Sequence, residues 1–502
     1  MHCRDAGQRS ALTTPLGAGS RGLVTSTDTQ SSSTPSEAAD HTKGTSKYAW
    51  YIVIVLMVCY TLSFIDRQIL SLLVGPIRRD LSISDTKIGL LQGTAFALFY
   101  TLLGLPLGRL ADRASRRNLI AAGVFLWSLM TGLCSVARSF GSLFLTRMGV
   151  GVGEASLAPA AHSMIADYFP VERLGTALSV YAMGIFIGSG AALIVGGTVV
   201  SAVAGLPAVD LPLIGMIASW RLTFLIVAVP GIPVGFLVYS VREPLRRNLL
   251  MTSDGRVSRL SIREVLRQFA LRWESVAGVS VGLSCQAMCN YALLAWAPSY
   301  FLRVYGWGAA RTGLVLGVLI LSIGCFGMYA GGKLCDRWQQ QKLKEAPLKV
   351  GVVSTLSAGL FFALSMCMPR VELTLALLAP ALFFLAMPVG SSYAALQLIF
   401  PNQARSQVAA LLVFTIGMGG QTLGPLLPGV LNDYLFKDGN MVGYSLAITI
   451  GLASILSAAS FRAIYKPYRT HYTKMRELEF NEKGAELARV PGWDRPLSSG
   501  SQ

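Results

Sequence analysis

Twelve apolar stretches, each long enough to cross a lipid bilayer, constrain the fold of this chain more than any other feature. A transmembrane helix needs roughly 20 apolar residues. Two of the stretches, 49–77 and 142–166, carry internal charges. The other ten contain no Asp, Glu, Lys or Arg: 88–108, 118–137, 174–209, 222–241, 275–302, 312–332, 350–369, 373–404, 406–432 and 439–461. The pattern predicts an all-α membrane protein with twelve transmembrane helices.

The charge composition agrees with a membrane protein whose basic residues lie in alternate loops. Only 14% of the residues are charged, against about 25% in soluble proteins. This excludes a soluble enzyme and a disordered chain. The net charge of +17 comes mostly from Arg and Lys in the loops between predicted spans 2 and 3, 6 and 7, and 8 and 9. The positive-inside rule places these loops in the cytoplasm together with both termini. The excess therefore reflects topology, and we expect no nucleic-acid partner. The loop at 78–87 is an exception, because it is basic on the opposite side.

The chain contains an internal repeat. The sequence GRLADR at 108–113 recurs as GKLCDR at 332–337. Two similar loops in corresponding positions predict two related six-helix halves, a known transporter plan. The predicted organisation is an N-terminal disordered tail, a first bundle, a cytoplasmic amphipathic linker, a second bundle and a cytoplasmic C-terminal tail: 1–47, 48–242, 243–274, 275–467 and 468–502.

Four charged residues lie inside predicted spans, where each is costly unless it pairs or faces water: Asp66, Arg67, Arg147 and Glu154. Arg147 and Glu154 are seven residues apart, so they share one face of a helix about 10.5 Å apart along its axis. The depths of spans 1 and 4 let Asp66 approach Arg147 and Arg67 approach Glu154. A structural ion-pair cluster is one interpretation, and a proton site beside an anion anchor is the other, which we favour.

The sequence GRLADRASRR at 108–117 resembles the loop signature of the major facilitator superfamily, with Ser115 in place of the usual Gly. YTLSFIDRQ at 60–68, RMGVGVGEA at 147–155 and DYFP at 167–170 are similar to the spinster branch of that superfamily. Animal members of this branch export sphingosine 1-phosphate or lysophospholipids. The resemblance covers about residues 48–467. It implies proton coupling by Glu154 and Asp66, an anion-binding role for Arg67, and a monomer.

The second half has no charge inside a predicted span. Its polar and aromatic residues are candidates for the uncharged wall of a substrate cavity. Arg67 and Arg147 would lie on the opposite, charged wall. They also fit helix-to-helix hydrogen bonding or, for Trp296, an interfacial aromatic belt. The substrate-binding candidates in this half are Asn290, Tyr291, Trp296, Ser391, Tyr393 and Gln397.

The repeated loop is the predicted conformational lock. We expect Asp112 to accept hydrogen bonds at the end of a span or to pair across the two halves, and its basic neighbours to hold that end at the lipid headgroups. A simple positive-inside anchor would explain the arginines but not Asp112 or its counterpart. The lock residues are Gly108, Asp112, Arg113, Arg116, Arg117, Asp336 and Arg337.

No cofactor or metal is expected. The eight cysteines show no metal-ligand spacing, and no phosphate-binding Gly-Lys-Ser/Thr motif suggests ATP as the energy source. The sequence therefore predicts a proton-coupled transporter of an anionic amphipathic lipid, such as a lysophospholipid or sphingoid phosphate. It would lie in a bacterial inner membrane among lipids that also contact it. Transport of a small polar solute, such as an organic anion or sugar, and drug/proton antiport are the alternatives.

Overall fold

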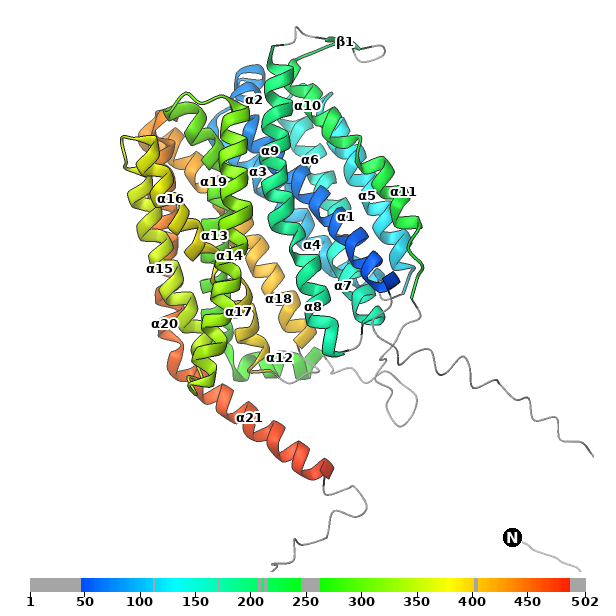
Figure 1. The fold of residues 1–502 in the computed structure, drawn as a ribbon, viewed down its shortest axis with the longest axis vertical. Coiled ribbons are helices and arrows are strands. Elements are labelled where there is room, and N and C mark those ends of the chain that lie inside the picture. The colour runs from blue at the N-terminus through cyan, green and yellow to red at the C-terminus, as the bar shows by residue number, and fades with distance from the viewer. Residues whose placement is uncertain are drawn as a thin grey trace, which may run out of the picture. The chain divides into compact units, whose positions relative to one another are not determined.

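The computed structural model describes residues 47–111, 113–169, 171–205, 209–211, 215–244, 262–400 and 405–487, which belong to one compact unit. The fold is helical, with one short β-hairpin (Figure 1). In the hairpin, β1 (Val209–Leu211) pairs antiparallel with β2 (Gly215–Ile217). We call the end of the bundle that carries this hairpin the hairpin end. The opposite end carries α12 and the start of α21, and we call it the linker end (Figure 1).

The first half contains eleven helices in the part of the chain that is described. They are α1 (Lys47–Leu72), α2 (Val74–Leu81), α3 (Asp85–Gln92), α4 (Thr94–Ala111), α5 (Arg116–Cys134), α6 (Phe140–Glu154), α7 (Leu157–Tyr168), α8 (Val171–Ala182), α9 (Gly184–Ala204), α10 (Ser219–Ala228) and α11 (Gly231–Tyr239).

The second half begins with the linker helix α12 (Ile262–Leu271) and ends with a C-terminal helix, α21 (Tyr465–Leu487). Between them lie α13 (Trp273–Val304), α14 (Ala309–Gln340), α15 (Ala346–Met366), α16 (Val371–Ala386), α17 (Pro388–Gln397), α18 (Arg405–Thr415), a π-helix η3 (Ile416–Gln421), α19 (Thr422–Val430), a second π-helix η4 (Leu431–Phe436), a 3-10 turn η5 (Gly439–Met441) and α20 (Val442–Ala463).

Within the described residues, nine helical segments are long and apolar enough to cross a membrane. They correspond to nine of the twelve predicted spans. The predicted spans 88–108, 142–166 and 373–404 are each built from two helices with a short break: α3 and α4, α6 and α7, and α16 and α17. The last break precedes Pro388, which has no backbone N–H to continue a helix. The architecture of a multi-span helical membrane protein is confirmed.

The outer surface of the bundle is apolar, as a lipid-facing surface must be. Large side chains in mid-helix stand well exposed, among them Leu145 at 64%, Phe236 at 63% and Leu452 at 64%. In water such a surface would favour aggregation, whereas in a bilayer it has no such cost. Between the halves, α9 contacts α14, α3 contacts α19, and α1 contacts α13.

Candidate functional site: a buried ion pair between α1 and α6

Arg67 and Glu154 form an ion pair inside the first half. The Arg67 Nη2 atom lies 2.6 Å from the Glu154 Oε2 atom, and Arg67 Nε donates a hydrogen bond of 2.6 Å to the same oxygen. The hydroxyl of Ser63, one turn before Arg67 on α1, donates to Oε2 as well, at 2.6 Å. The approach of Arg67 to Glu154 was expected from the depths of the two spans, and the structure brings these residues together.

The two oxygens of Glu154 differ sharply in their surroundings. Oε2 accepts both hydrogen bonds and makes the ion-pair contact with Arg67 Nη2, whereas Oε1 is buried and has no hydrogen-bond partner among the described residues. The Glu154 side chain has no exposed surface, while that of Arg67 keeps 10%. The pair is therefore almost fully buried, and Oε1 is the atom of Glu154 at which a proton could be added without breaking an existing hydrogen bond.

An aromatic box encloses the Arg67 guanidinium. Its central carbon lies 4.8 Å from the ring centroid of Phe64, 4.3 Å from that of Phe96 and 4.9 Å from that of Tyr100. Cation–π attraction of this kind is strongest where water is excluded. Gly151 brings α6 against α4 here, since a Cβ atom on it would lie 2.6 Å from the Phe96 carbonyl oxygen. Sequence reasoning missed the box. The spacing of Phe64 and Arg67 on one helix was the available indication, but Phe96 and Tyr100 come from another span.

Asp66 and Arg147 meet in a different way from the one expected. Arg147 Nη1 donates a 3.0 Å hydrogen bond to the main-chain carbonyl of Asp66, and not to its carboxylate. Both carboxylate oxygens of Asp66 are buried and have no hydrogen-bond partner among the described residues. The reason is the helix geometry: Asp66 and Arg67 point about 100° apart around α1, so both side chains cannot face α6.

The candidate residues of the second half have different surroundings. Tyr291 lies near Arg67, within the range of electrostatic interaction. Trp296 is fully buried, and its indole Nε1 donates a 2.8 Å hydrogen bond to the Pro425 carbonyl, so it joins α13 to α19. Ser391 is buried in α17, Asn290 is half-buried on α13, and the side chains of Tyr393 and Gln397 lie outside the described part of the structure.

The predicted lock at the linker end is only partly described. Asp112 lies outside the described residues, Gly108 is half-buried in α4, and Arg113 is exposed. Asp336 and Arg337 are exposed near the end of α14, and among the described residues their side chains have no ion pair. Arg117 is half-buried, and its guanidinium lies 5.8 Å from the ring centroid of Tyr239.

Arg116 is not a surface anchor for lipid headgroups. Only 1% of it is exposed, and it forms ion pairs with Asp167 at 2.5 Å and Glu243 at 2.8 Å. Its Nη1 atom also donates to the Ser163 hydroxyl at 2.8 Å. Arg116 therefore joins the start of α5 to α7 and to the chain that follows α11. This is a structural role inside the first half.

The helical bundle, its apolar outer surface and the ion pair buried inside it define a membrane protein of many spans with a charged site in its interior. The sequence profile of the Major Facilitator Superfamily matches residues 56–366, which is more than half of the chain. The chain belongs to this superfamily, and it is a transporter and not an enzyme.

Several curated proteins are similar over most of the chain. An MFS-type efflux pump of Mycolicibacterium smegmatis is 28% identical, covering 84% of this chain and 94% of its own length. A probable L-galactonate transporter of Escherichia coli is 26% identical, covering 81% and 90%. The protein spinster homolog 1 of Xenopus tropicalis is 27% identical, covering 77% and 73%.

A solved structure has the same fold. The crystal structure of a bacterial homologue of the human lysosomal transporter Spinster, in an inward-facing and unoccupied conformation, superposes with a TM-score of 0.69 at 24% identity. The match covers 86% of this chain and 99% of that one. The spinster-like resemblance of the sequence is thus supported by relatives and by fold.

Proposed function

We propose that this transporter carries an anionic amphipathic lipid, of the lysophospholipid or sphingoid-phosphate type, and that protons drive it. The observation that carries the proposal is the asymmetry of Glu154: three donors converge on Oε2, and none reaches Oε1. A proton added at Oε1 neutralises the carboxylate. Arg67 then loses the charge that holds it, and its donors become available to a substrate anion.

The surroundings of Arg67 favour an amphipathic ligand. Three aromatic rings cover its guanidinium, so an anionic group that binds there brings its neighbouring atoms against aromatic surface. A phosphate can accept two parallel hydrogen bonds from one guanidinium. An apolar tail then extends along the aromatic wall instead of into water.

Asp66 is the second proton carrier in this proposal. Its carboxylate is buried without a hydrogen-bond partner among the described residues. An ionised carboxylate is costly to bury without hydrogen-bond donors, which supports a role for Asp66 in carrying a proton. Arg147, which donates a hydrogen bond to the Asp66 main-chain carbonyl, supplies a positive charge beside this residue.

One comparison favours a second substrate class. A probable L-galactonate transporter is among the similar proteins, and its substrate is a small sugar acid. Arg67 would serve a carboxylate as well as a phosphate. The two candidates differ in the tail, since a sugar acid needs hydrogen-bonding partners where a lipid needs apolar surface. A drug/proton antiporter is the third candidate, favoured by the similar efflux pump.

The basic loops support one orientation in the membrane. We propose that the linker end faces the cytoplasm with both termini and that the hairpin end faces outward across a bacterial inner membrane. The support is the concentration of basic residues in the loops of the linker end.

The proposal is tested with the purified protein in liposomes. Labelled lysophosphatidic acid, galactonate and an uncharged lysolipid are offered with and without a pH gradient, to the parent and to Glu154→Gln. Accumulation of the anionic lysolipid that depends on the gradient and is lost in Glu154→Gln is expected. Glu372→Gln, which changes an exposed glutamate at the start of α16, is the matched control and should transport like the parent. Accumulation of galactonate alone would reject the lipid assignment, and gradient-driven accumulation by Glu154→Gln would reject the proton assignment.

A further inference from the structure

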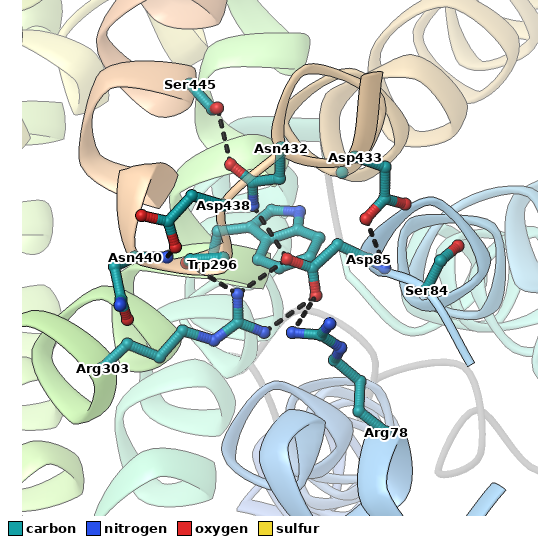
Figure 2. Close-up of polar contacts among 12 residues, drawn as sticks. Arg78, Ser84, Asp85, Trp296, Arg303, Asn432, Asp433, Asp438, Asn440 and Ser445 are labelled. Atoms are coloured by element: carbon teal, nitrogen blue, oxygen red, sulfur yellow. Dashed lines mark hydrogen bonds and ion pairs between the residues drawn. The ribbon is translucent and has the colours of Figure 1, made fainter. Parts of the chain in front are cut away.

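The two halves are joined at the hairpin end by a buried carboxylate, Asp85, the first residue of α3 (Figure 2). Asp85 has no exposed surface. Arg303, at the end of α13 in the second half, donates Nη2 to Asp85 Oδ1 at 2.8 Å and Nη1 to Oδ2 at 2.7 Å. This is a bidentate pair, the strongest geometry that an arginine and a carboxylate form.

The remaining acceptor sites of Asp85 are also filled. Arg78 of the same half lies 3.2 Å from Oδ1, and Asn432 of the second half donates to Oδ2 at 3.0 Å. Asn432 is in turn held by the Ser445 hydroxyl at 2.6 Å. Of the ion pairs found between described residues, the one between Asp85 and Arg303 joins the two halves, and the others lie within one half or in the linker helix.

A second contact between the halves caps α3. The carboxylate of Asp433, on η4, accepts from the backbone N–H of Asp85 at 3.2 Å and from that of Thr86 at 2.6 Å. The first four N–H groups of a helix have no partner within it. Ser84, in the same half, satisfies the N–H of Lys87. Two of the remaining groups therefore depend on a residue from the other half.

The helices that carry these groups are in backbone contact. A Cβ atom on Gly89 of α3 would lie 2.6 Å from the carbonyl oxygen of Pro425 in α19. Contact this close leaves no room for a path between α3 and α19. The close contact between α3 and α19 and the carboxylates of Asp85 and Asp433 therefore form one interface between the halves. It is built from α2 and α3 on one side and from α13, α19 and η4 on the other.

We infer that Asp85, with Arg303, Asn432 and Asp433, is the lock that holds the hairpin end shut and that it must break in each transport cycle. Alternating access requires this end to open. Opening separates Asp85 from Arg303 and Asn432, and separates Asp433 from the start of α3. Arg78 moves with Asp85, because both lie in the first half, and remains as its partner in the open state. An open surface depression of about 620 Å³, lined by Arg78, Arg79, Arg303 and Asn440 among others, borders the lock.

The lock is tested by a distance between the halves, measured without substrate, so that its failure is separate from any failure of the proposed function. Spin labels are placed at Arg79→Cys and Asn440→Cys, two exposed positions on opposite halves, with Cys3, Cys325 and Cys367 replaced by serine. Pulsed electron resonance then reports the populations with the hairpin end closed and open. The test variant is Asp85→Asn, which keeps the size of the side chain and removes its charge.

In Asp85→Asn we expect the ratio of open to closed populations to rise about tenfold or more, the scale of one lost charge-assisted contact. The matched control is Asp80→Asn. Asp80 pairs with Arg221 at 2.8 Å at the same end but within one half, so its loss should leave the ratio unchanged. Equal effects of the two variants would overturn the lock.

Two further variants protect the test against a local folding defect. Asp433→Ala removes the cap without touching the ion pair, and it should shift the ratio in the same direction as Asp85→Asn. Arg78→Gln cuts a contact of Asp85 within the first half only. A rise in the open population in Arg78→Gln as large as that in Asp85→Asn would mean that local folding of α2 and α3 holds the end shut, and would overturn the inference.

Discussion

Removing the guanidinium of Arg67 should weaken the binding of anionic ligands more than the binding of neutral ones. In the structure two nitrogens of Arg67 hold Glu154, and the proposal transfers these donors to the substrate. A hydrogen bond to a charged group contributes about 1.5–3 kcal/mol. Arg67→Ala should therefore raise the Kd of a lysophosphatidic acid by about 10- to 150-fold. Arg67→Lys should recover only part, because an ammonium lacks the planar fork.

The assay compares two ligands on the same variant. Binding of lysophosphatidic acid and of its headgroup-free analogue is measured by calorimetry in detergent, for the parent and for both variants. Arg67→Ala also leaves Glu154 with Ser63 as its remaining hydrogen-bond donor, which costs stability. That cost is common to both ligands and cancels in the ratio of their dissociation constants. Equal losses for the two ligands would refute the anion-anchor role and leave Arg67 as a structural partner of Glu154.

Three further predictions concern the linker end. Arg116→Ala should lower the free energy of unfolding by about 3–5 kcal/mol, because it removes a buried cation that two carboxylates share. Arg113→Ala, at an exposed position, should change it by about 0.5 kcal/mol or less. Thermal unfolding of both variants in detergent measures this, and similar midpoints would contradict the structural role of Arg116. Burial opposes ionisation of Glu243, but hydrogen bonds from the backbone N–H of Arg117 and from the Arg116 side chain outweigh it and hold its pKa below the usual 4.5. The contribution of Glu243 to stability is therefore complete above pH 4.5 and is lost as the pH falls below it. Glu243→Gln should flatten the dependence of the unfolding temperature on pH in that range, and an unchanged slope would refute this. Asp112→Asn should slow turnover far more than it weakens substrate binding, as judged from initial transport rates and the substrate Kd. A large rise in Kd with unchanged turnover would contradict the predicted lock at the linker end.

The sequence predicted the pairing of Arg67 with Glu154 because two rules are sufficient for it. Membrane depth follows from counting residues along an apolar helix, and charges in hydrocarbon must find a partner. The same reasoning did not settle Asp66 and Arg147. The direction of a side chain around α1 and the exact rotation of α6 decide whether a guanidinium meets a carboxylate or a carbonyl, and these depend on packing with the other helices.

Arg116 shows a second limit of sequence reasoning. Arginines next to a membrane span usually lie at the headgroups, so its position predicted an anchor. The structure buries it because Asp167 and Glu243, remote in the sequence, are brought to the same place by α7 and by the chain after α11. Nothing in the local pattern distinguishes this arginine from Arg113.

By itself, then, the sequence determined the helical, membrane-spanning architecture and the central ion pair, since these follow from local composition and helical periodicity. The twelve-span count and the division into two halves stay predictions from the apolar stretches and the internal repeat. The tertiary structure alone decided the contacts between the halves. Asp85 and Arg303 are 218 residues apart, at positions that look like ordinary ends of helices. They meet because α3 packs against α19 and α13 ends beside them, and an association of helices is set by the fit of their surfaces, which no single stretch of sequence contains.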